Sequence, residues 1–248
     1  MFVDKEGNEI DRIVGFKPPQ EYLAEMTRIR NGVNTYPDLL RQWDEDPLNA
    51  EVLASLAMKV EGMGGLEAAV GYWEELFKLD NVDSKMRATA NYKMASYMAQ
   101  QQNDPSPLLS LLNTEKDVDI LLETHGALVS YYKRAKDAAA EATAYKRYVD
   151  FTVGAGQESP GFLNGYAWRM TQLEQNLEDA LDRINEAVTL LDSLAEAREQ
   201  AQILDTKAEV LWKLGRIEDA VNVIDSCIVL QPEDSYYQEQ RTKFTANI

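Results

Sequence analysis

The sequence predicts an all-α protein, an α-α superhelix of repeated helix pairs that follows a short N-terminal β-hairpin. Three observations predict this fold class. Apolar residues recur with the 3.6-residue period of a helix from Leu39 onward. Two distant stretches share one register of small, glycine and large residues, which is typical of an internal repeat. Only residues 2–16 carry short β-forming runs, and these flank a turn at Gly7.

Residues 1–32 are expected to form a separate N-terminal domain, because their pattern differs from the rest of the chain. Strands are expected at residues 2–4 and 9–16, and a helix over residues 20–30, which follows two prolines. The apolar face of this helix would consist of Tyr22, Leu23, Met26 and Ile29.

This N-terminal run resembles the last part of a thioredoxin-like domain. Such a domain ends with a strand carrying Val-Asp, a Glu-Gly or Asp-Gly turn, a strand ending Arg-x-x-Gly, and a final helix. The matching residues are Val3-Asp4, Glu6-Gly7, Arg12 to Gly15 and residues 20–30. The resemblance implies that the chain is the C-terminal part of a longer thioredoxin-like protein. The Cys-x-x-Cys pair of a redox site does not occur in it, since Cys227 is the single cysteine.

Two strands alone leave an edge with unpaired N–H and C=O groups. The hairpin is therefore expected either to pack on the first helix pair or to pair with a second copy of the chain. The second arrangement would produce a homodimer through the hairpin.

The clearest repeat appears when the chain is aligned with itself at the offset of 151 residues that separates Ala57 from Ala208. The other aligned pairs are Gly64 with Gly215, Ala69 with Ala220, Trp73 with Ile224, and Leu76 with Cys227. Small residues allow two helices to approach closely, a glycine permits a turn with positive φ, and large residues fill the junction with the next pair. The shared register predicts two equivalent helix–turn–helix units.

This pattern resembles the tetratricopeptide repeat (TPR), a helix–turn–helix unit of about 34 residues. Weaker units centred on Ala95, Gly126 and Ala167 lie between the two clear ones, so residues 38–248 are expected to hold five helix pairs. Pro232 is expected to end the last pair. Residues 235–246 would form a polar helix that caps the exposed end of the repeat.

The composition argues against two classes of partner. The formal net charge is −17, whereas binding to nucleic acid needs cations that displace counterions from phosphates. No run of about 18 apolar residues occurs, so no membrane span is expected. The first 32 residues carry six acids and five bases, so almost all of the negative charge lies in the repeat region. A soluble chain is expected, cytoplasmic, or periplasmic if the longer parent protein carries a signal peptide, and the single thiol does not decide between these compartments.

Candidate catalytic and cofactor sites are weak. The glycine-rich run at residues 61–67 lacks the Gly-Lys-Ser/Thr of a phosphate loop and is expected to be a repeat turn. His125, the single histidine, is expected to be packed rather than catalytic, and Cys227 occupies a core position. No metal-ligand spacing occurs. We therefore expect no catalytic residues, no metal and no cofactor.

The resemblance to TPR proteins implies a groove lined by the first helix of each pair. The residues expected to face it are Met58, Glu61, Asn164, Trp168, Asp205, Glu209 and Trp212. Acidic and aromatic types dominate this set, which favours a protein or peptide partner that carries a basic segment with an apolar anchor. Trp168 and Trp212 are either anchors for that partner or packed against neighbouring helices.

The sequence thus predicts a protein-interaction scaffold or adaptor attached to a thioredoxin-like domain. An alternative is the C-terminal part of a thiol–disulfide oxidoreductase whose catalytic half lies outside this sequence. A third class is a structural spacer or self-association module.

Overall fold

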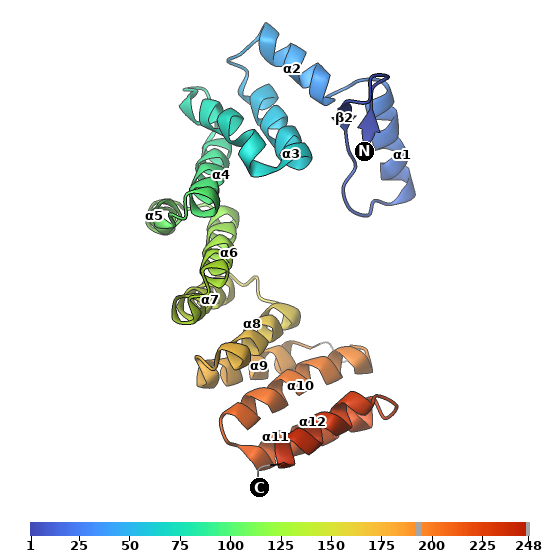
Figure 1. The fold of residues 1–248 in the computed structure, drawn as a ribbon, viewed down its shortest axis with the longest axis vertical. Coiled ribbons are helices and arrows are strands. Elements are labelled where there is room, and N and C mark those ends of the chain that lie inside the picture. Colours follow the sequence, from blue (N-terminus) through green and yellow to red (C-terminus); the bar gives the residue numbers. More distant parts are fainter. Residues whose placement is uncertain (192–194, 247–248) are drawn as a thin grey trace. The chain divides into compact units, whose positions relative to one another are not determined.

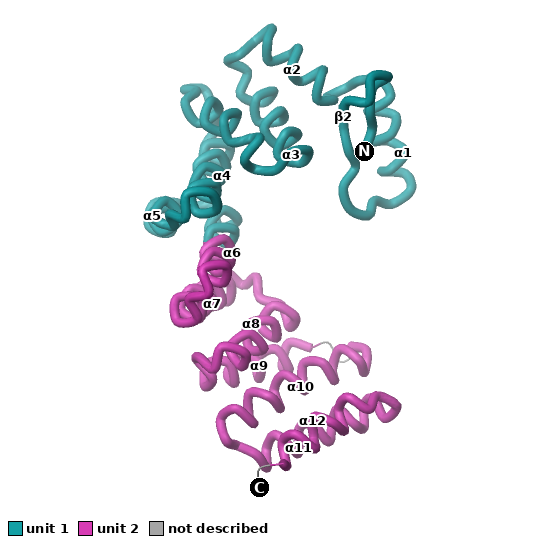
Figure 2. The backbone as a smooth tube through the Cα atoms, in the orientation of Figure 1, with its two compact units in different colours: residues 1–124 teal, residues 125–248 magenta. Residues whose placement is uncertain are grey.

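A computed structural model describes residues 1–191 and 195–246 of the 248-residue chain. The chain divides into two compact units, residues 1–124 and 125–248 (Figure 1, Figure 2). The described residues are all-α apart from one two-stranded hairpin, which confirms the expected fold class. The assignment of residues 1–32 and 38–248 to separate domains stays a prediction.

Unit 1 begins with the hairpin and continues with helices. Its elements are β1 (Phe2–Val3), β2 (Glu9–Asp11), α1 (Pro19–Arg30), α2 (Tyr36–Glu45), α3 (Ala50–Lys78), α4 (Ser84–Gln101) and α5 (Ser106–Thr114). Helix α6 (Val118–Ala135) runs from unit 1 into unit 2. Unit 2 continues with α7 (Ala138–Gly154), α8 (Pro160–Leu173), α9 (Leu177–Leu190), α10 (Ala197–Lys213), α11 (Ile217–Leu230) and α12 (Ser235–Thr245).

The hairpin is shorter than the sequence predicted. β2 ends at Asp11, so the strand expected over residues 9–16 is wrong beyond that point. Asp11, the last residue of the strand, has a buried carboxylate that is bonded to the helices of unit 1. It accepts hydrogen bonds from Lys59 Nζ on α3 at 2.7 Å and from Arg28 Nη2 on α1 at 2.8 Å. The hairpin therefore packs against the first helix pair, one of the two expected arrangements.

Helix α1 has the expected apolar residues, but most of them are uncovered. Ile29 is buried, whereas Tyr22, Leu23 and Met26 are exposed. Leu23 and Met26, together with Phe2 and other hairpin residues, line an apolar cavity of about 440 Å³ in unit 1.

The first repeat turn lies one residue later than expected. Helix α3 spans Ala50–Lys78 but contains Gly65 at φ 80° and ψ 176°, so it consists of two helices joined at that residue. Gly64, the residue expected to have positive φ, is helical, and a Cβ on it would lie 2.9 Å from the Ala68 Cβ. Gly215 has the expected positive φ, 76°. The turn at residues 61–67 is therefore confirmed, but Gly65 rather than Gly64 has the positive φ.

The repeat core follows the sequence register. The small residues Ala57, Ala69, Ala208 and Ala220 are fully buried at the aligned positions. The larger Trp73, Ile224, Leu76 and Cys227 are buried too. The described elements form the five expected pairs, with the two halves of α3 as the first, then α4–α5, α6–α7, α8–α9 and α10–α11. Helix α11 ends at Leu230, two residues before Pro232, and α12 covers the end with Tyr237 and Phe244 buried, as expected.

His125 and Cys227 occupy packed positions. The His125 ring lies against the rings of Tyr148, at 6.0 Å, and Phe151, at 5.0 Å, and burial is the main cause that lowers its pKa. Burial also raises the pKa of the Cys227 thiol to about 12. Both packing expectations are confirmed.

Neither a membrane-spanning helix nor a cluster of metal ligands occurs in the described residues. No described helix combines the length and apolar character needed to cross a membrane. No group of three or more His, Cys, Asp or Glu residues in the described part of the chain is placed to hold a metal ion.

Candidate functional site

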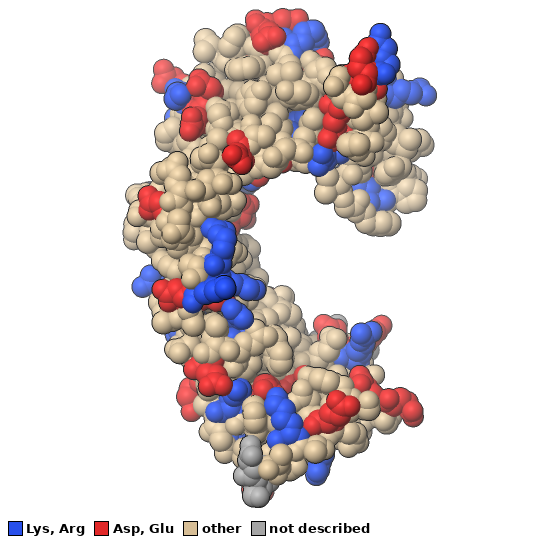
Figure 3. All heavy atoms as spheres, viewed as in Figure 1, with Lys and Arg blue, Asp and Glu red and all other residues tan. Residues whose placement is uncertain are grey.

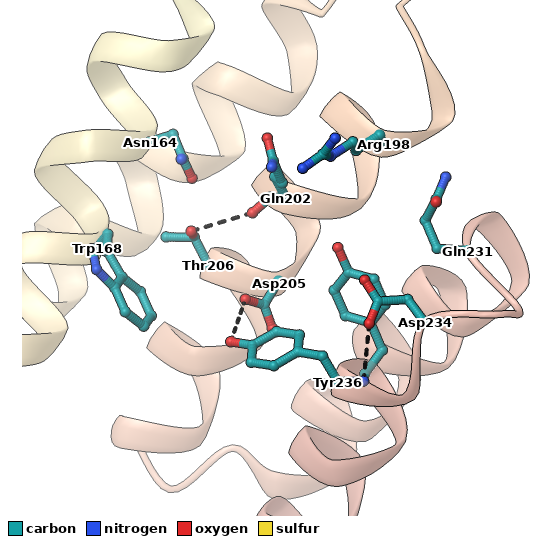
Figure 4. Close-up of a pocket in the computed structure, with 10 residues that line it drawn as sticks. Asn164, Trp168, Arg198, Gln202, Asp205, Thr206, Gln231, Asp234 and Tyr236 are labelled. Atoms are coloured by element: carbon teal, nitrogen blue, oxygen red, sulfur yellow. Dashed lines mark hydrogen bonds between the residues drawn. The ribbon is translucent and has the colours of Figure 1, made fainter.

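Unit 2 contains a cavity of about 570 Å³ between the first helices of its last two pairs and the capping helix. We call it the α8–α10 pocket. The lining residues that matter below are Asn164 and Trp168 from α8, Arg198 and Asp205 from α10, and Asp234 and Tyr236 from the start of α12 (Figure 4). Its volume lies within the roughly 300–1,000 Å³ typical of ligand pockets.

Helix geometry places the α8 side chains on the pocket. Helix α8 begins at Pro160, whose fixed φ suits a first helical position, and the Ser159 Oγ accepts a hydrogen bond from the Phe162 N–H at 3.2 Å. Asn164 and Trp168 are four residues apart, so they lie on one face of the helix. That face borders the pocket, while Ala167 and Met170 point into the core.

Helical spacing also places side chains of α10 on the pocket, and a helix cap places those at the start of α12. Arg198, Gln202 and Asp205 recur at intervals of four and three residues, so they lie on one face of α10. At the start of α12, the Asp234 Oδ1 accepts a hydrogen bond from the Tyr236 N–H at 3.1 Å and caps the helix. The Tyr236 ring lies beside Asp205 of α10, as Figure 4 shows.

Asp205 is the electrostatic centre of the pocket. Its Oδ2 accepts a hydrogen bond from the Tyr236 hydroxyl at 3.1 Å, while its Oδ1 is buried without a hydrogen-bond partner among the described residues. Burial raises the pKa of Asp205 to about 6, with a further rise from the charge of Glu209. A buried carboxylate with one unpartnered oxygen is a strong acceptor for a cationic donor.

Asn164 and Trp168 add a hydrogen-bond acceptor and an apolar surface to the pocket. The Asn164 Oδ1 is also buried without a partner in the described part of the chain, so a second polar atom there lacks a hydrogen bond. The Trp168 side chain is 37% exposed. It therefore offers a large apolar surface to a ligand.

Two of the expected groove residues, Glu209 and Trp212, do not line this pocket. Glu209 is 6% exposed and accepts hydrogen bonds from Lys243 Nζ at 2.9 and 2.7 Å. The Trp212 ring lies 5.7 Å from the Phe244 ring, and the Lys243 Nζ lies 4.5 Å above the Trp212 ring. Both residues thus join α10 to α12.

The expected groove residues of unit 1 behave differently again. Met58 is 57% exposed and borders none of the cavities described. The Glu61 carboxylate accepts hydrogen bonds from Lys93 Nζ at 2.7 Å and from Trp73 Nε1 at 3.0 Å. Glu61 therefore links α3 to α4.

Sequence reasoning missed Arg198, Asp234 and Tyr236. Arg198 lies seven residues before Asp205, two helical turns along the same face, so the groove register extended by two turns would have included it. Asp234 and Tyr236 belong to the capping helix, which no repeat register covers. Their contribution follows from the packing of α12 against α10.

A second cavity in unit 2, of about 430 Å³, also borders Trp168. It is lined by residues of α6, α7 and α8, among them Lys133, Tyr145 and Tyr148. Arg169, which lies there too, forms a bidentate ion pair with the buried Glu141 at 2.6 and 2.9 Å. Trp168 therefore separates two neighbouring cavities on the first helices of unit 2.

Comparison with known proteins supports the fold. No family model matches the sequence, and no curated protein matches it. Among solved structures, YrrB, described as a TPR protein with an unusual peptide-binding site, is similar with a TM-score of 0.54 and 14% identity, over 82% of this chain and 97% of that one.

A putative kinesin light chain of Podosopora anserina with nearly identical TPR-like repeats has a TM-score of 0.51 and 14% identity, over 75% of this chain and 97% of its own. At these identities the likeness shows the fold alone, and this fold is TPR-like.

Proposed function

We propose that the protein is a non-enzymatic interaction module that binds a segment of a partner protein along the first helices of unit 2. The observation that carries this proposal is the α8–α10 pocket. It combines an exposed indole, Trp168, with two unpartnered buried polar atoms, on Asn164 and Asp205. Tryptophan is among the residues enriched at binding hot spots. The two polar atoms without partners are additional points at which a ligand could form hydrogen bonds. The TPR-like fold is compatible with this use.

Binding is better supported than catalysis. A general base acts on a nucleophile within hydrogen-bond reach. The Thr206 hydroxyl, the aliphatic hydroxyl nearest to Asp205 in sequence, instead donates to the Gln202 carbonyl of its own helix at 3.3 Å. The other hydroxyl at Asp205 is the phenol of Tyr236, whose pKa is raised to about 12 by burial. Neither hydroxyl is activated for attack.

The charge of the pocket favours a basic segment. Asp205 and Asp234 contribute two negative charges at neutral pH and Arg198 one positive charge, so the lining carries a net charge of −1. The whole chain carries −17, although basic side chains are also present on the face in Figure 3. A basic segment would be attracted from a distance and held by its apolar anchor on Trp168.

A peptide-display selection on the purified chain tests the proposal. Selected peptides should lose about tenfold or more in affinity on Trp168→Ala, the loss typical of a hot-spot residue. Val229→Ala is the matched control, because Val229 is an exposed apolar residue on the second helix α11, away from the pocket. Peptides that bind Trp168→Ala and the parent chain equally would show that this face is not the binding site.

The contacts of Asp11 with the helices of unit 1 leave the apolar cavity beside α1 open, and this favours a second interaction, homodimerisation. β1 pairs only with β2 in the described part of the chain, and the apolar cavity beside it is open. Residues 1–32 carry a net charge of −1 against −16 for the remainder, so two copies repel each other least here. We propose a second copy as the occupant of this surface.

Light scattering tests the dimer. Leu23→Glu places a charge on the exposed α1 face and should reduce the mass to that of a monomer. Leu190→Glu, at an exposed position of unit 2, should leave the mass unchanged. A monomer mass for the parent chain would contradict the proposal.

The thioredoxin-like relationship also stays a proposal, supported by the order strand, strand, helix in residues 2–30. Thiol chemistry by this chain would depend on Cys227, which is buried and has a raised pKa of about 12. We therefore expect no insulin-reduction activity. Activity that Cys227→Ala abolishes would overturn this expectation.

A further inference from the structure

We propose that the α8–α10 pocket is a lysine subsite, with the ammonium group of a partner's lysine at Asp205 and Asn164 and its aliphatic stem along Trp168. This proposal rests on the proposed function and names the chemistry of its ligand. It follows from what the pocket lacks, from its charge, and from a similar arrangement that the chain already contains.

The pocket lacks hydrogen-bond donors where it needs them. Five buried side-chain nitrogen or oxygen atoms in the described residues have no partner, and two of these, Asp205 Oδ1 and Asn164 Oδ1, line this one cavity. A buried polar atom without a partner destabilises the folded state, because it has lost its hydrogen bonds to water and gained none in return. An ammonium group carries three donors on a single nitrogen and can therefore reach more than one such atom. Figure 4 shows the Asn164 side chain extending from α8 toward α10, and the Asp205 carboxylate beside the Tyr236 ring to whose hydroxyl its Oδ2 is bonded.

Charge selects a cation over an anion. The carboxylate of Asp205 repels anions, and Asp234 adds a second negative charge at the rim. Arg198, the cation in the lining, lies two helical turns before Asp205 on α10, and no ion pair between the two is found in the described structure. An incoming lysine would therefore meet a carboxylate that accepts a hydrogen bond from Tyr236 but forms no ion pair among the described residues.

The chain contains its own version of this arrangement. Lys243 Nζ lies 2.7 Å from the Glu209 Oε2 and 4.5 Å from the centre of the Trp212 ring. One lysine thus satisfies a buried carboxylate and covers an indole. Asp205 and Trp168 are likewise a carboxylate and an indole that line one cavity, and no ion pair or ring contact joins either of them to a lysine of the described residues.

Asp205 also makes the subsite sensitive to pH. The charged and titratable groups near it are Glu209 and Arg198 on α10, Lys243, Tyr236 and Tyr237 on α12, Asp234 before α12, and Cys227 on α11. The α8 residues that line the pocket, Asn164 and Trp168, are uncharged. Burial holds the pKa of Asp205 near 6, so the lysine would bind the ionised form and lose affinity as the pH falls below that value.

Nuclear magnetic resonance with two small probes tests the subsite. Nα-acetyl-lysine amide and Nα-acetyl-norleucine amide have similar aliphatic stems, and only the first carries an ammonium group. The lysine probe should shift the indole N–H signal of Trp168, which Trp168→Phe identifies, and the norleucine probe should bind at least about tenfold more weakly. Asp205→Asn should abolish this difference. Glu199→Gln, which removes an exposed charge from the same helix, should preserve it.

The outcomes separate this proposal from the proposed function. Equal shifts from both probes, no shift up to the solubility limit, or shifts that survive Asp205→Asn would overturn the lysine subsite. Display-selected peptides that depend on Trp168 but carry no enriched lysine would also overturn it while supporting the interaction module. A lysine-specific shift without any selected peptide that depends on Trp168 would support the subsite and contradict the module.

Discussion

The first helix pair, in α3, and the last, α10 with α11, share their core and differ at every groove position. The core alanines Ala57 and Ala208 are both fully buried. The aligned groove positions are Ala54 and Asp205, Met58 and Glu209, and Glu61 and Trp212. These alanine positions face the partner helix of the same pair, so the close helix–helix distance restricts them to small residues. Groove positions face the next helix, which packs beside the pair.

The neighbour differs between the two pairs, and the groove residues differ with it. In unit 1, Glu61 on α3 binds Lys93 on α4 at 2.7 Å. In unit 2, Glu209 on α10 binds Lys243 on the capping helix α12, also at 2.7 Å. Each is an ion pair between the first helix of a pair and the next helix beside it. Asp205 forms no such pair with a lysine of the described residues, and that exception marks the candidate site.

The largest effect is expected for the core of the first pair. Trp73 is buried and donates a hydrogen bond to Glu61, so Trp73→Ala should lower the free energy of unfolding by about 4 kcal/mol. Trp168→Ala should cost less than about 1 kcal/mol, because its ring is already partly in water. Urea denaturation followed by circular dichroism measures both. Equal losses would place Trp168 in the core and remove the basis for a binding role.

The next effect separates Asp205 from ordinary surface carboxylates. Its folded pKa of about 6 lies above the unfolded 3.8, so the folded chain binds more protons between these values. Stability should therefore fall as the pH rises from about 4 to above 6. Asp205→Asn removes this cost and should stabilise the protein by roughly 2 kcal/mol at about pH 7.5, with little effect near pH 4.

Thermal midpoints measured across this pH range check the Asp205 prediction. Asp182→Asn serves as the control, because Asp182 is exposed on α9. A stabilisation by Asp205→Asn that does not change with pH would contradict the assigned titration.

A smaller difference is expected between the two ion pairs of the groove. Lys243→Met leaves the nearly buried Glu209 without its cation and should cost about 2 kcal/mol. Lys93→Met should cost less than about 1 kcal/mol, since water reaches Glu61 and the Trp73 Nε1 still donates to it. Adding Glu209→Gln to Lys243→Met should recover most of the loss. Chemical denaturation of these variants measures the costs, and equal values for both lysine variants would show that burial does not distinguish the two pairs.

The smallest effects concern the repeat turns. Gly65 and Gly215 have φ of 80° and 76°, so each glycine-to-alanine change should cost about 1 kcal/mol. Gly62 is helical, with open space around its missing Cβ, and Gly62→Ala should be neutral or slightly stabilising. Denaturation midpoints of the three variants check this. A loss for Gly62→Ala as large as for Gly65→Ala would mean that the bend does not depend on the left-handed residue.

Periodic features of the sequence were sufficient to predict the helices of the five pairs and their core, whereas α2 (Tyr36–Glu45) was not predicted. The register that aligned Ala69 with Ala220 and Trp73 with Ile224 is the register of burial in the structure. Local signals were less exact. The strand predicted to reach residue 16 ends at Asp11, and the left-handed glycine is Gly65 rather than Gly64. The bonds of Asp11 to Arg28 and Lys59 join residues far apart in the sequence, and a residue pattern does not distinguish one of two adjacent glycines from the other.

The sequence by itself determined the helical repeat, its five pairs and its cap, because burial with a 3.6-residue period depends only on the spacing of residues along each helix. It also indicated Asn164, Trp168 and Asp205 as residues that face one groove. Only the tertiary structure decided that these three share a pocket, that α12 supplies Tyr236 to it, and that Lys243 covers Trp212 but not Trp168. These facts depend on which residues of different helices come within hydrogen-bond reach, and no spacing along one helix records that distance.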